Sequence, residues 1–209
     1  MSNILIHPTY FPNVAHFVAM IQAREITFEW DDNFQKQTYR NRCYVYGANG
    51  KLSLNIPIIH TQKQRQKYRN VKIQNTEDWQ RNHWKSLESA YRTSPFFEFY
   101  VDDLKFLFET PFENLYDFNT LCFNTICECL QLDFSIENSS EYIHKPSDKT
   151  DYRQLVNAKK EKPFGFEKYI QVFSDKHGFI ENLSILDLLF NEGPNAISYL
   201  ESQSLNRHG

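Results

Sequence analysis

The sequence predicts an α/β fold: a small, mostly parallel sheet begun by a βαβ unit, an antiparallel hairpin, and a largely helical second half. Three observations predict it. A short apolar run, 3–7, and a segment of alternating apolar residues, 25–32, flank a segment with helical spacing. The dipeptide Asn49-Gly50 separates two runs in which apolar and polar residues alternate. From Thr76 onward, apolar residues recur mainly at intervals of three and four, as on one face of a helix.

The first unit consists of a strand over 3–7 (NILIH), a helix over 12–23 and a strand over 25–32 (EITFEWDD). A strand, a helix and a strand in this order form a parallel pair with a right-handed crossover. Ligands of such sheets bind beyond the carboxyl ends of the strands. We therefore expect the segments HPTYFP and DDNFQ, which leave the two strands at that edge, to border a ligand cleft.

The next segment, 42–58 (RCYVYGANGKLSLNIPI), predicts an antiparallel hairpin, because Asn49-Gly50 supplies the positive φ angles of a tight turn. The polar and basic stretch 60–70 predicts a mobile loop. Residues 71–74 (VKIQ) predict a short strand that follows this loop.

The second half predicts three amphipathic helices, over 76–93, 96–109 and 113–132, with Thr76 as the first N-cap and Pro95 and Pro111 as breaks. A loop-rich excursion over the cleft follows. The helix SILDLLFNEG then ends at Gly193, and a last helix starts at Pro194. We expect one domain over 1–209, composed of an α/β part (about 1–75), a helical part (about 76–135), the excursion (about 137–166) and C-terminal helices to about 201.

Composition indicates a globular chain: 41% of the 209 residues are hydrophobic and 16% are aromatic. No apolar run approaches the roughly 18 residues that a membrane span needs. The N-terminus shows no basic leader followed by an apolar core, so we expect no secretion signal and a cytoplasmic protein. The four cysteines include no CxxC pair and are expected to be reduced and buried; they are Cys43, Cys122, Cys127 and Cys129.

The net charge of −3 conceals a segregation of charge along the chain. The stretch 33–76 contains nine basic residues and no acidic one, whereas the rest of the chain has 14 basic and 26 acidic residues. This split predicts a positively charged hollow for an anionic small molecule, such as a nucleotide sugar or an acyl donor. The alternative is a solvated basic face without a ligand. Nucleic acid is not expected as a partner, because acids elsewhere outweigh the basic stretch and no known module is present.

Candidate site residues follow both predicted parallel strands. His7, Tyr10 and His16 follow the first strand, and an imidazole can contact a phosphate or transfer a proton. Asp31 and Asp32 follow the second strand and should point to opposite faces, so that one of them binds a ligand hydroxyl or Mg²⁺. Arginine suits bidentate contact with phosphate or carboxylate. The remaining ligand-binding candidates here are Lys36, Tyr39, Arg40, Asn41 and Arg42.

Two further groups are candidates. On the helix over 76–93, His83 shares a face with Leu87, Ala90 and Tyr91, which fits either a buried structural histidine or a base. At the start of the helix after residue 182, free backbone N–H groups favour anions. Helix capping is the alternative function of these side chains, which are Asn182, Ser184 and Asp187.

Several familiar chemistries have no motif in this chain. The sequence lacks GxxxxGK[ST], GxGxxG, GxSxG and HExxH, and its six glycines supply few phosphate-binding loops. The ligand spacing of a zinc site is also missing. The sequence therefore predicts no metal site of this kind and identifies no cofactor.

Four segments together resemble the WbqC-like family of bacterial proteins: HPTYFP, DDNFQKQTYRNRC, NHWKSLESAYRTSPFFEFY and SILDLLFNEGP. They occur in the family's order over about residues 4–201. Much of the family has Gln-Pro where this chain has His7-Pro8, which favours hydrogen bonding to a ligand over proton transfer at this position. The resemblance implies a role in bacterial surface-polysaccharide (O-antigen type) biosynthesis.

On this basis we expect an enzyme that transfers an acyl or aminoacyl group to an activated sugar. Asp31 or Asp32 would contact a hydroxyl, an amine or a metal, and His7 or His83 would be the base. Lys36, Arg40 and Arg42 would hold phosphate or carboxylate. The alternative is a non-catalytic protein that binds a nucleotide sugar or a partner of the glycan pathway.

Overall fold

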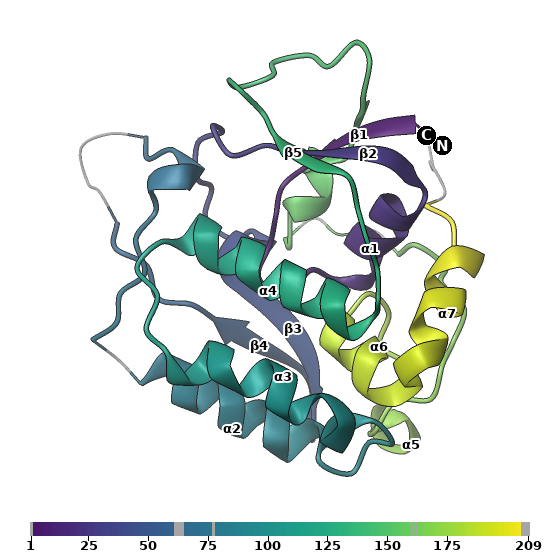
Figure 1. Cartoon of the computed structure of the whole chain (residues 1–209). Helices are drawn as coiled ribbons and strands as arrows, with labels where there is room; N and C mark the ends of the chain where they lie inside the picture. The colour runs from purple at the N-terminus through teal and green to yellow at the C-terminus, as the bar shows by residue number, and fades with distance from the viewer. Residues whose placement is uncertain (1, 61–64, 77, 160, 162, 206–209) are drawn as a thin grey trace.

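The structure is a computed structural model that describes residues 2–60, 65–76, 78–159, 161 and 163–205. It contains a four-stranded sheet, a two-stranded sheet and helices around both (Figure 1), which confirms the α/β prediction. The strands are β1 Ser2–Ile6, β2 Ala23–Phe28, β3 Arg42–Gly47, β4 Gly50–Asn55, β5 Ile136–Asn138 and β6 Thr150–Asp151. The helices are α1 Val14–Ile21, α2 Trp79–Tyr91, α3 Phe97–Glu109, α4 Leu115–Cys129, α5 Ser174–His177, α6 Ile185–Glu192 and α7 Ala196–Ser202. Short 3₁₀ turns are η1 Tyr39–Asn41, η2 Tyr68–Asn70, η3 Arg153–Val156 and η4 Gly193–Asn195.

The four-stranded sheet has the order β5-β2-β1-β6, and all three of its strand pairs are parallel. The predicted βαβ unit is confirmed, with Ile6 of β1 in register with Phe28 of β2. Because the pairing is parallel, the carboxyl ends of β1, β2 and β6 meet at one edge. The backbone continues this alignment past the strands, where the N–H of Glu29 donates to the carbonyl of Ile6.

Local details differ from the sequence-based expectations. The segment 137–166, predicted as an excursion, contributes the end of β5 and all of β6, strands too short to show an alternating pattern. Residues 71–74 form only isolated bridges, because Ile73 pairs with Ile58 and Lys72 with Asn114. Helix α2 begins at Trp79, and its N-cap is Asp78 rather than the predicted Thr76.

The predicted hairpin is confirmed by β3 and β4, whose ends pair at Gly47 and Gly50. Gly50 has a φ of +99°, which a tight hairpin turn requires. Helix α2 packs beside the hairpin, where the N–H of Tyr46 donates to the Tyr91 hydroxyl at 2.9 Å. That hydroxyl in turn donates to Asp187 on α6 at 2.8 Å, so one chain of hydrogen bonds links hairpin, α2 and α6.

Aromatic side chains form much of the core between these elements. Phe123 of α4 stacks on Phe17 of α1 at 5.7 Å and meets Phe28 of β2 edge-on at 5.4 Å, which joins both helices to the sheet. All four cysteines are free, and three of them are buried. Among the described residues, no helix combines the length and apolar character needed to cross a membrane.

The end of α6 provides a sharp test of this packing. Gly193 has a φ of +51°, and a Cβ added there would lie 2.5 Å from the ring of Phe96. Gly193→Ala is therefore expected to lower the free energy of unfolding by about 3 kcal/mol, from overpacking and the left-handed backbone together. Urea denaturation measures the change. The control is Gly178→Ala, which shares a positive φ of +73° but has open space around the new Cβ, so it should lose only the part caused by the backbone. Equal losses in both variants would contradict the predicted clash.

Candidate functional site

The carboxyl ends of β1, β2 and β6 border a cavity of about 300 Å³, which we call the strand-end cavity. A groove of about 720 Å³ lies elsewhere, beside Ser2, Ile4 and Glu201, but it lacks a comparable group of charged side chains. The strand-end cavity combines carboxylates, guanidinium groups, amides and an imidazole. Its lining residues are His7, Asp32, Gln35, Arg40, Tyr142, Asp151, Arg153, Gln154, Val156 and Asn157.

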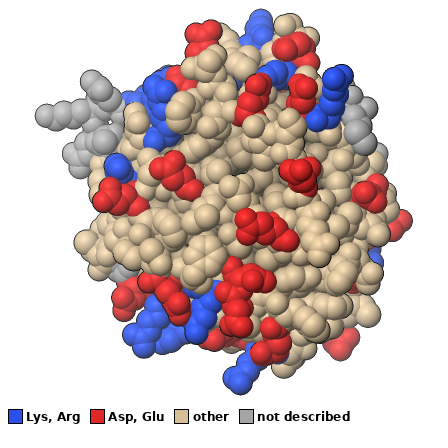
Figure 2. Space-filling model, viewed as in Figure 1, with Lys and Arg blue, Asp and Glu red and all other residues tan. Residues whose placement is uncertain are grey.

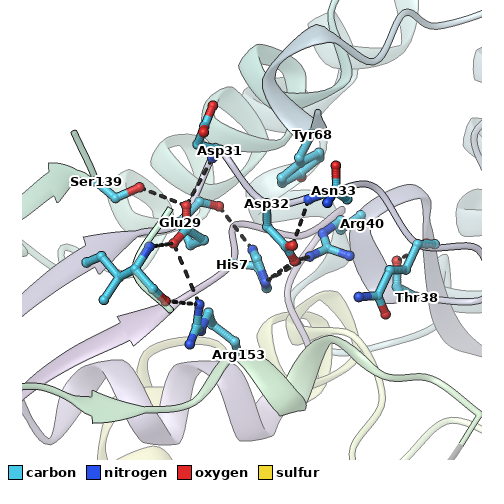
Figure 3. Close-up of polar contacts among 12 residues, drawn as sticks. His7, Glu29, Asp31, Asp32, Asn33, Thr38, Arg40, Tyr68, Ser139 and Arg153 are labelled. Carbon is cyan, nitrogen blue, oxygen red and sulfur yellow. Dashed lines mark hydrogen bonds and ion pairs between the residues drawn. The ribbon is translucent and has the colours of Figure 1, made fainter. Parts of the chain in front are cut away.

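His7 is the first residue after β1 and is buried. Its Nδ1 lies 3.0 Å from the carbonyl oxygen of Glu29, so Nδ1 must carry the proton and donate it. Nε2 then carries no proton, and its lone pair accepts a hydrogen bond from Nη2 of Arg40 at 2.8 Å (Figure 3). Burial and the nearby Arg40 charge lower the pKa of His7 to about 4, so the imidazole is neutral at pH 7.

Arg40 lies in η1 and is fully buried. Nη2 also donates to Asp32 Oδ2 at 2.7 Å, and the guanidinium carbon lies 5.2 Å from the ring centre of Tyr68. Asn119 of α4 fixes the backbone here by donating to the Arg40 carbonyl. Nε and Nη1 of Arg40 have no hydrogen-bond partner among the described residues. This buried cation therefore retains unused donors.

Asp32 remains ionised in this setting. Burial alone would raise its pKa, but the Arg40 charge and the hydrogen bond from the Asn33 N–H hold the pKa below its usual range. One carboxylate oxygen accepts from Arg40, and the other accepts from the N–H of Asn33 at 2.6 Å. The described residues contain no group of three or more His, Cys, Asp or Glu side chains placed to hold a metal ion.

A second arginine lines the cavity but has its donors occupied. Arg153 forms a double hydrogen bond with Asp151 and donates to the carbonyl of Ile143 at 2.6 Å. Its Nη1 lies 3.7 Å from the fully buried Glu29, which also accepts from Ser139 at 2.9 Å (Figure 3). Arg153 therefore holds the segment around Ile143 against the strand ends, while Arg40 keeps free donors.

The structure brings three predicted site residues together: His7, Asp32 and Arg40. Asp31 points elsewhere, as expected from its position beside Asp32, and pairs with Lys67 at 3.0 Å and Arg69 at 3.1 Å. The other candidates from this segment do not line the cavity. Lys36 is exposed, Asn41 donates to the carbonyl of Ile56, and Arg42 is half-buried at the start of β3.

Tyr10 and His83 form a separate buried pair. The Tyr10 hydroxyl lies 3.0 Å from Nδ1 of His83, and the ring of Trp79 packs edge-on against this imidazole. Burial lowers the pKa of His83 to about 4. Neither side chain lines the strand-end cavity, and the burial of His83 beside Leu87 places it in the core face of α2.

The candidates around α1 and α6 hold these helices together. Asn182 accepts from the N–H of Ala15 and donates to Glu161, which also accepts from the Tyr39 hydroxyl at 2.8 Å. Ser184 caps α6. Two remaining residues are also buried: Asp187, which accepts from Tyr91, Tyr169 and Gln171, and His16, which bonds Asn13.

The described residues of 33–76 do not form the expected basic hollow. Of the nine basic residues in 33–76, Lys63 lies outside the described residues, and among the other eight Arg40 alone lines the cavity. Acidic residues from elsewhere neutralise several of the rest: Asp31 pairs with Lys67 and Arg69, Glu161 with Lys51, and Glu113 with Lys72. The distribution of charge along the sequence could not reveal this neutralisation, because the paired residues lie far apart along the chain.

Three charged residues at the strand ends were not predicted as site residues: Glu29, Asp151 and Arg153. The sequence does hold a signal for Asp151 and Arg153, because an Asp and an Arg two residues apart can form a local bidentate pair. Without a recognisable strand at Thr150–Asp151, that pair could not be assigned to the sheet edge. Glu29 lies within the predicted strand over 25–32, where the sequence pattern marks it only as a polar position.

Comparisons with known proteins identify the family of this chain. A family model described as "WbqC-like protein family" matches residues 7–174, a range that contains every residue lining the cavity. "Uncharacterized protein Rv1507c" of Mycobacterium tuberculosis (strain ATCC 25618 / H37Rv) is 26% identical over 225 residues, covering 94% of this chain and 96% of that protein. No solved structure gave a significant match. Since the family model covers most of its length, the chain belongs to the WbqC-like protein family.

Proposed function

We propose that this protein binds a sugar derivative bearing a phosphate or carboxylate, such as a nucleotide sugar, in the strand-end cavity during bacterial surface-polysaccharide biosynthesis. The observation that carries the proposal is Arg40, a fully buried guanidinium that lines the cavity and has two nitrogens without partners among the described residues. Leaving a buried donor unsatisfied costs about 1–3 kcal/mol. An anionic oxygen of a ligand would remove that cost.

The other lining groups suit the neutral part of such a ligand. Asp32 and Asp151 can accept hydrogen bonds from hydroxyl or amine groups, and the amides of Gln35, Gln154 and Asn157 can donate or accept. The volume of about 300 Å³ is at the lower end of the usual range for ligand sites. This size favours a sugar with one phosphate inside the cavity, and any nucleotide part would extend outside.

Acyl or aminoacyl transfer to the sugar is the second candidate function, favoured by the neutral His7 imidazole in the cavity wall. If a ligand anion draws Arg40 away, the Nε2 lone pair becomes available. It would take the proton of the attacking sugar amine or hydroxyl as the new acyl bond forms and the bond to the leaving group breaks. In the binding-only alternative, His7 serves as a hydrogen-bond acceptor.

Ligand-induced stabilisation provides the test. We expect a sugar 1-phosphate or a uridine diphosphate sugar, at 100 times its dissociation constant, to stabilise the protein by about 2.7 kcal/mol. For a chain of this length that raises the melting temperature by about 5–10 °C. Gln35→Ala and Gln154→Ala, both exposed at the cavity, should weaken the response without affecting the fold. Lys36→Ala is the matched control from the basic stretch. No shift with any phosphorylated sugar, nucleotide sugar or acyl donor would reject the proposal.

His7→Gln distinguishes the two candidates, because glutamine keeps a hydrogen-bonding side chain but cannot act as a base at neutral pH. Binding alone predicts that the variant retains its thermal shift. Transfer through His7 predicts that the wild type acylates a bound amino-sugar nucleotide, as measured by mass spectrometry, and that the variant binds without turnover.

A further inference from the structure

A second surface, remote in sequence from most of the cavity residues, is formed by α3 and α4. Residues 96–133 contain eight acidic residues and one basic residue, Lys105. Lys105 pairs with Glu109 at 3.5 Å, and Glu113 pairs with Lys72. Within the described part of the chain, the other six acidic side chains of this segment form no ion pair: Glu98, Asp102, Asp103, Asp117, Glu128 and Asp133.

Apolar side chains project from the same surface. Phe99 is 75% exposed and Phe106 is 42% exposed, and their spacing of seven residues places them on one stripe of α3. Asp103 lies between them on that stripe. A groove of about 320 Å³ runs beside it, lined by Asp103, Phe106, Thr125, Glu128 and Cys129. We call Phe99 and these five residues the α3–α4 face.

Phe99 meets the ring of Phe96 at 6.1 Å but remains 75% exposed, and within the described residues Asp103 and Glu128 form no ion pair. A single exposed apolar residue is ordinary, but two on one stripe beside a groove and flanked by unpaired carboxylates resemble an interface with apolar anchors and a charged rim. Figure 2 shows carboxylates spread over the side of the molecule that carries α3 and α4, while Lys and Arg lie mainly toward its periphery. Within the described residues, the carboxylates of this face thus have no cationic side chain as a partner.

We propose that the α3–α4 face docks a basic amphipathic helix of a partner protein. Leucine-like anchors of that helix would pack on Phe99 and Phe106 and enter the groove, and its Lys or Arg residues would meet Asp103 and Glu128. The 13 residues of α3 span about 20 Å, which matches three to four turns of a partner helix. The site lies apart from the strand-end cavity and does not depend on its ligand.

The test uses the full chain and a fluorescent 18-residue helix of leucine and lysine, measured by fluorescence anisotropy. We expect binding that Phe99→Ser, and separately Asp103→Asn combined with Glu128→Gln, weaken at least ten-fold. Ile170→Ser and Glu141→Gln are the matched controls, because Ile170 is 81% exposed and both residues lie outside the face. Phe99 is so exposed that its replacement should leave the thermal stability unchanged.

Three results would overturn the proposal. The first is the absence of binding by the wild type. The second is equal binding of a scrambled peptide of the same composition, since simple charge attraction would then suffice. The third is concentration-dependent self-association in analytical ultracentrifugation that Phe99→Ser abolishes, which would assign the face to a second copy of this chain.

Discussion

Lowering the pH from 7 toward 4.5 is expected to unfold the protein. Three buried histidines are responsible, because burial is the largest cause lowering the pKa of His7 and His83 to about 4 and that of His16 to about 3. In the unfolded chain these histidines bind protons near pH 6.5, whereas in the folded chain they bind protons only near pH 4 or below. The stability that the neutral imidazoles contribute is therefore fully present above pH 6.5 and is lost as the pH falls toward 4.

The size of this effect is comparable with the whole stability of a protein. In that interval each histidine lowers the free energy of unfolding by about 1.4 kcal/mol per pH unit, so the three together lower it by about 4 kcal/mol per unit. The whole free energy of unfolding of a typical protein is about 5–15 kcal/mol. Asp187 and Glu161 act in the opposite direction, since burial raises the pKa of each carboxyl and the folded state takes up its proton first.

Urea midpoints measured from pH 7.5 to 4.5 check the prediction. Replacing His83 by glutamine should reduce the slope of stability against pH by about a third, even if it lowers stability at pH 7. His144→Gln is the control, because His144 is exposed and its loss should leave the slope unchanged. A midpoint that stays constant down to pH 5 would show that the buried imidazoles are protonated in the folded state.

Arg40→Ala is the substitution with the largest expected effect on both fold and ligand response. Removing one partner of a buried charge pair costs about 3–5 kcal/mol, because the other charge is left uncompensated. Here Asp32 and Nε2 of His7 lose the same donor. For a chain of this length the melting temperature should fall by about 10 °C, and the shift caused by a sugar phosphate should disappear.

The control separates lost charge from lost ligand contact. Arg40→Met combined with Asp32→Asn removes both charges and keeps the volume, so the melting temperature should recover much of the loss while the ligand response stays absent. Lys36→Ala should change neither quantity, because an exposed side chain away from special features contributes within about 0.5 kcal/mol. A ligand response that survives in the double variant would remove Arg40 from the proposed site.

The sequence was most informative where the apolar residues of an element recur with a clear periodicity or where a residue type such as glycine marks a turn. The βαβ unit, the Gly50 hairpin and the three central helices appear as predicted, with ends shifted by a few residues. It was least informative for β5 and β6, which have three and two residues. Strands this short exist because an edge of an existing sheet offers them partners, so no local pattern needs to specify them.

The sequence by itself determined that His7 and Asp32 would meet at one edge, because parallel strands align their carboxyl ends. It also placed His83 on a face with Leu87, Ala90 and Tyr91, which the structure buries. Only the tertiary structure decided which charges remain available to a ligand. Asp31 is satisfied by Lys67 and Arg69, and Arg153 by Asp151 and a backbone carbonyl, while buried Arg40 keeps unused donors. The physical reason is that hydrogen bonds and ion pairs are completed in space, between residues whose distance along the chain carries no such information.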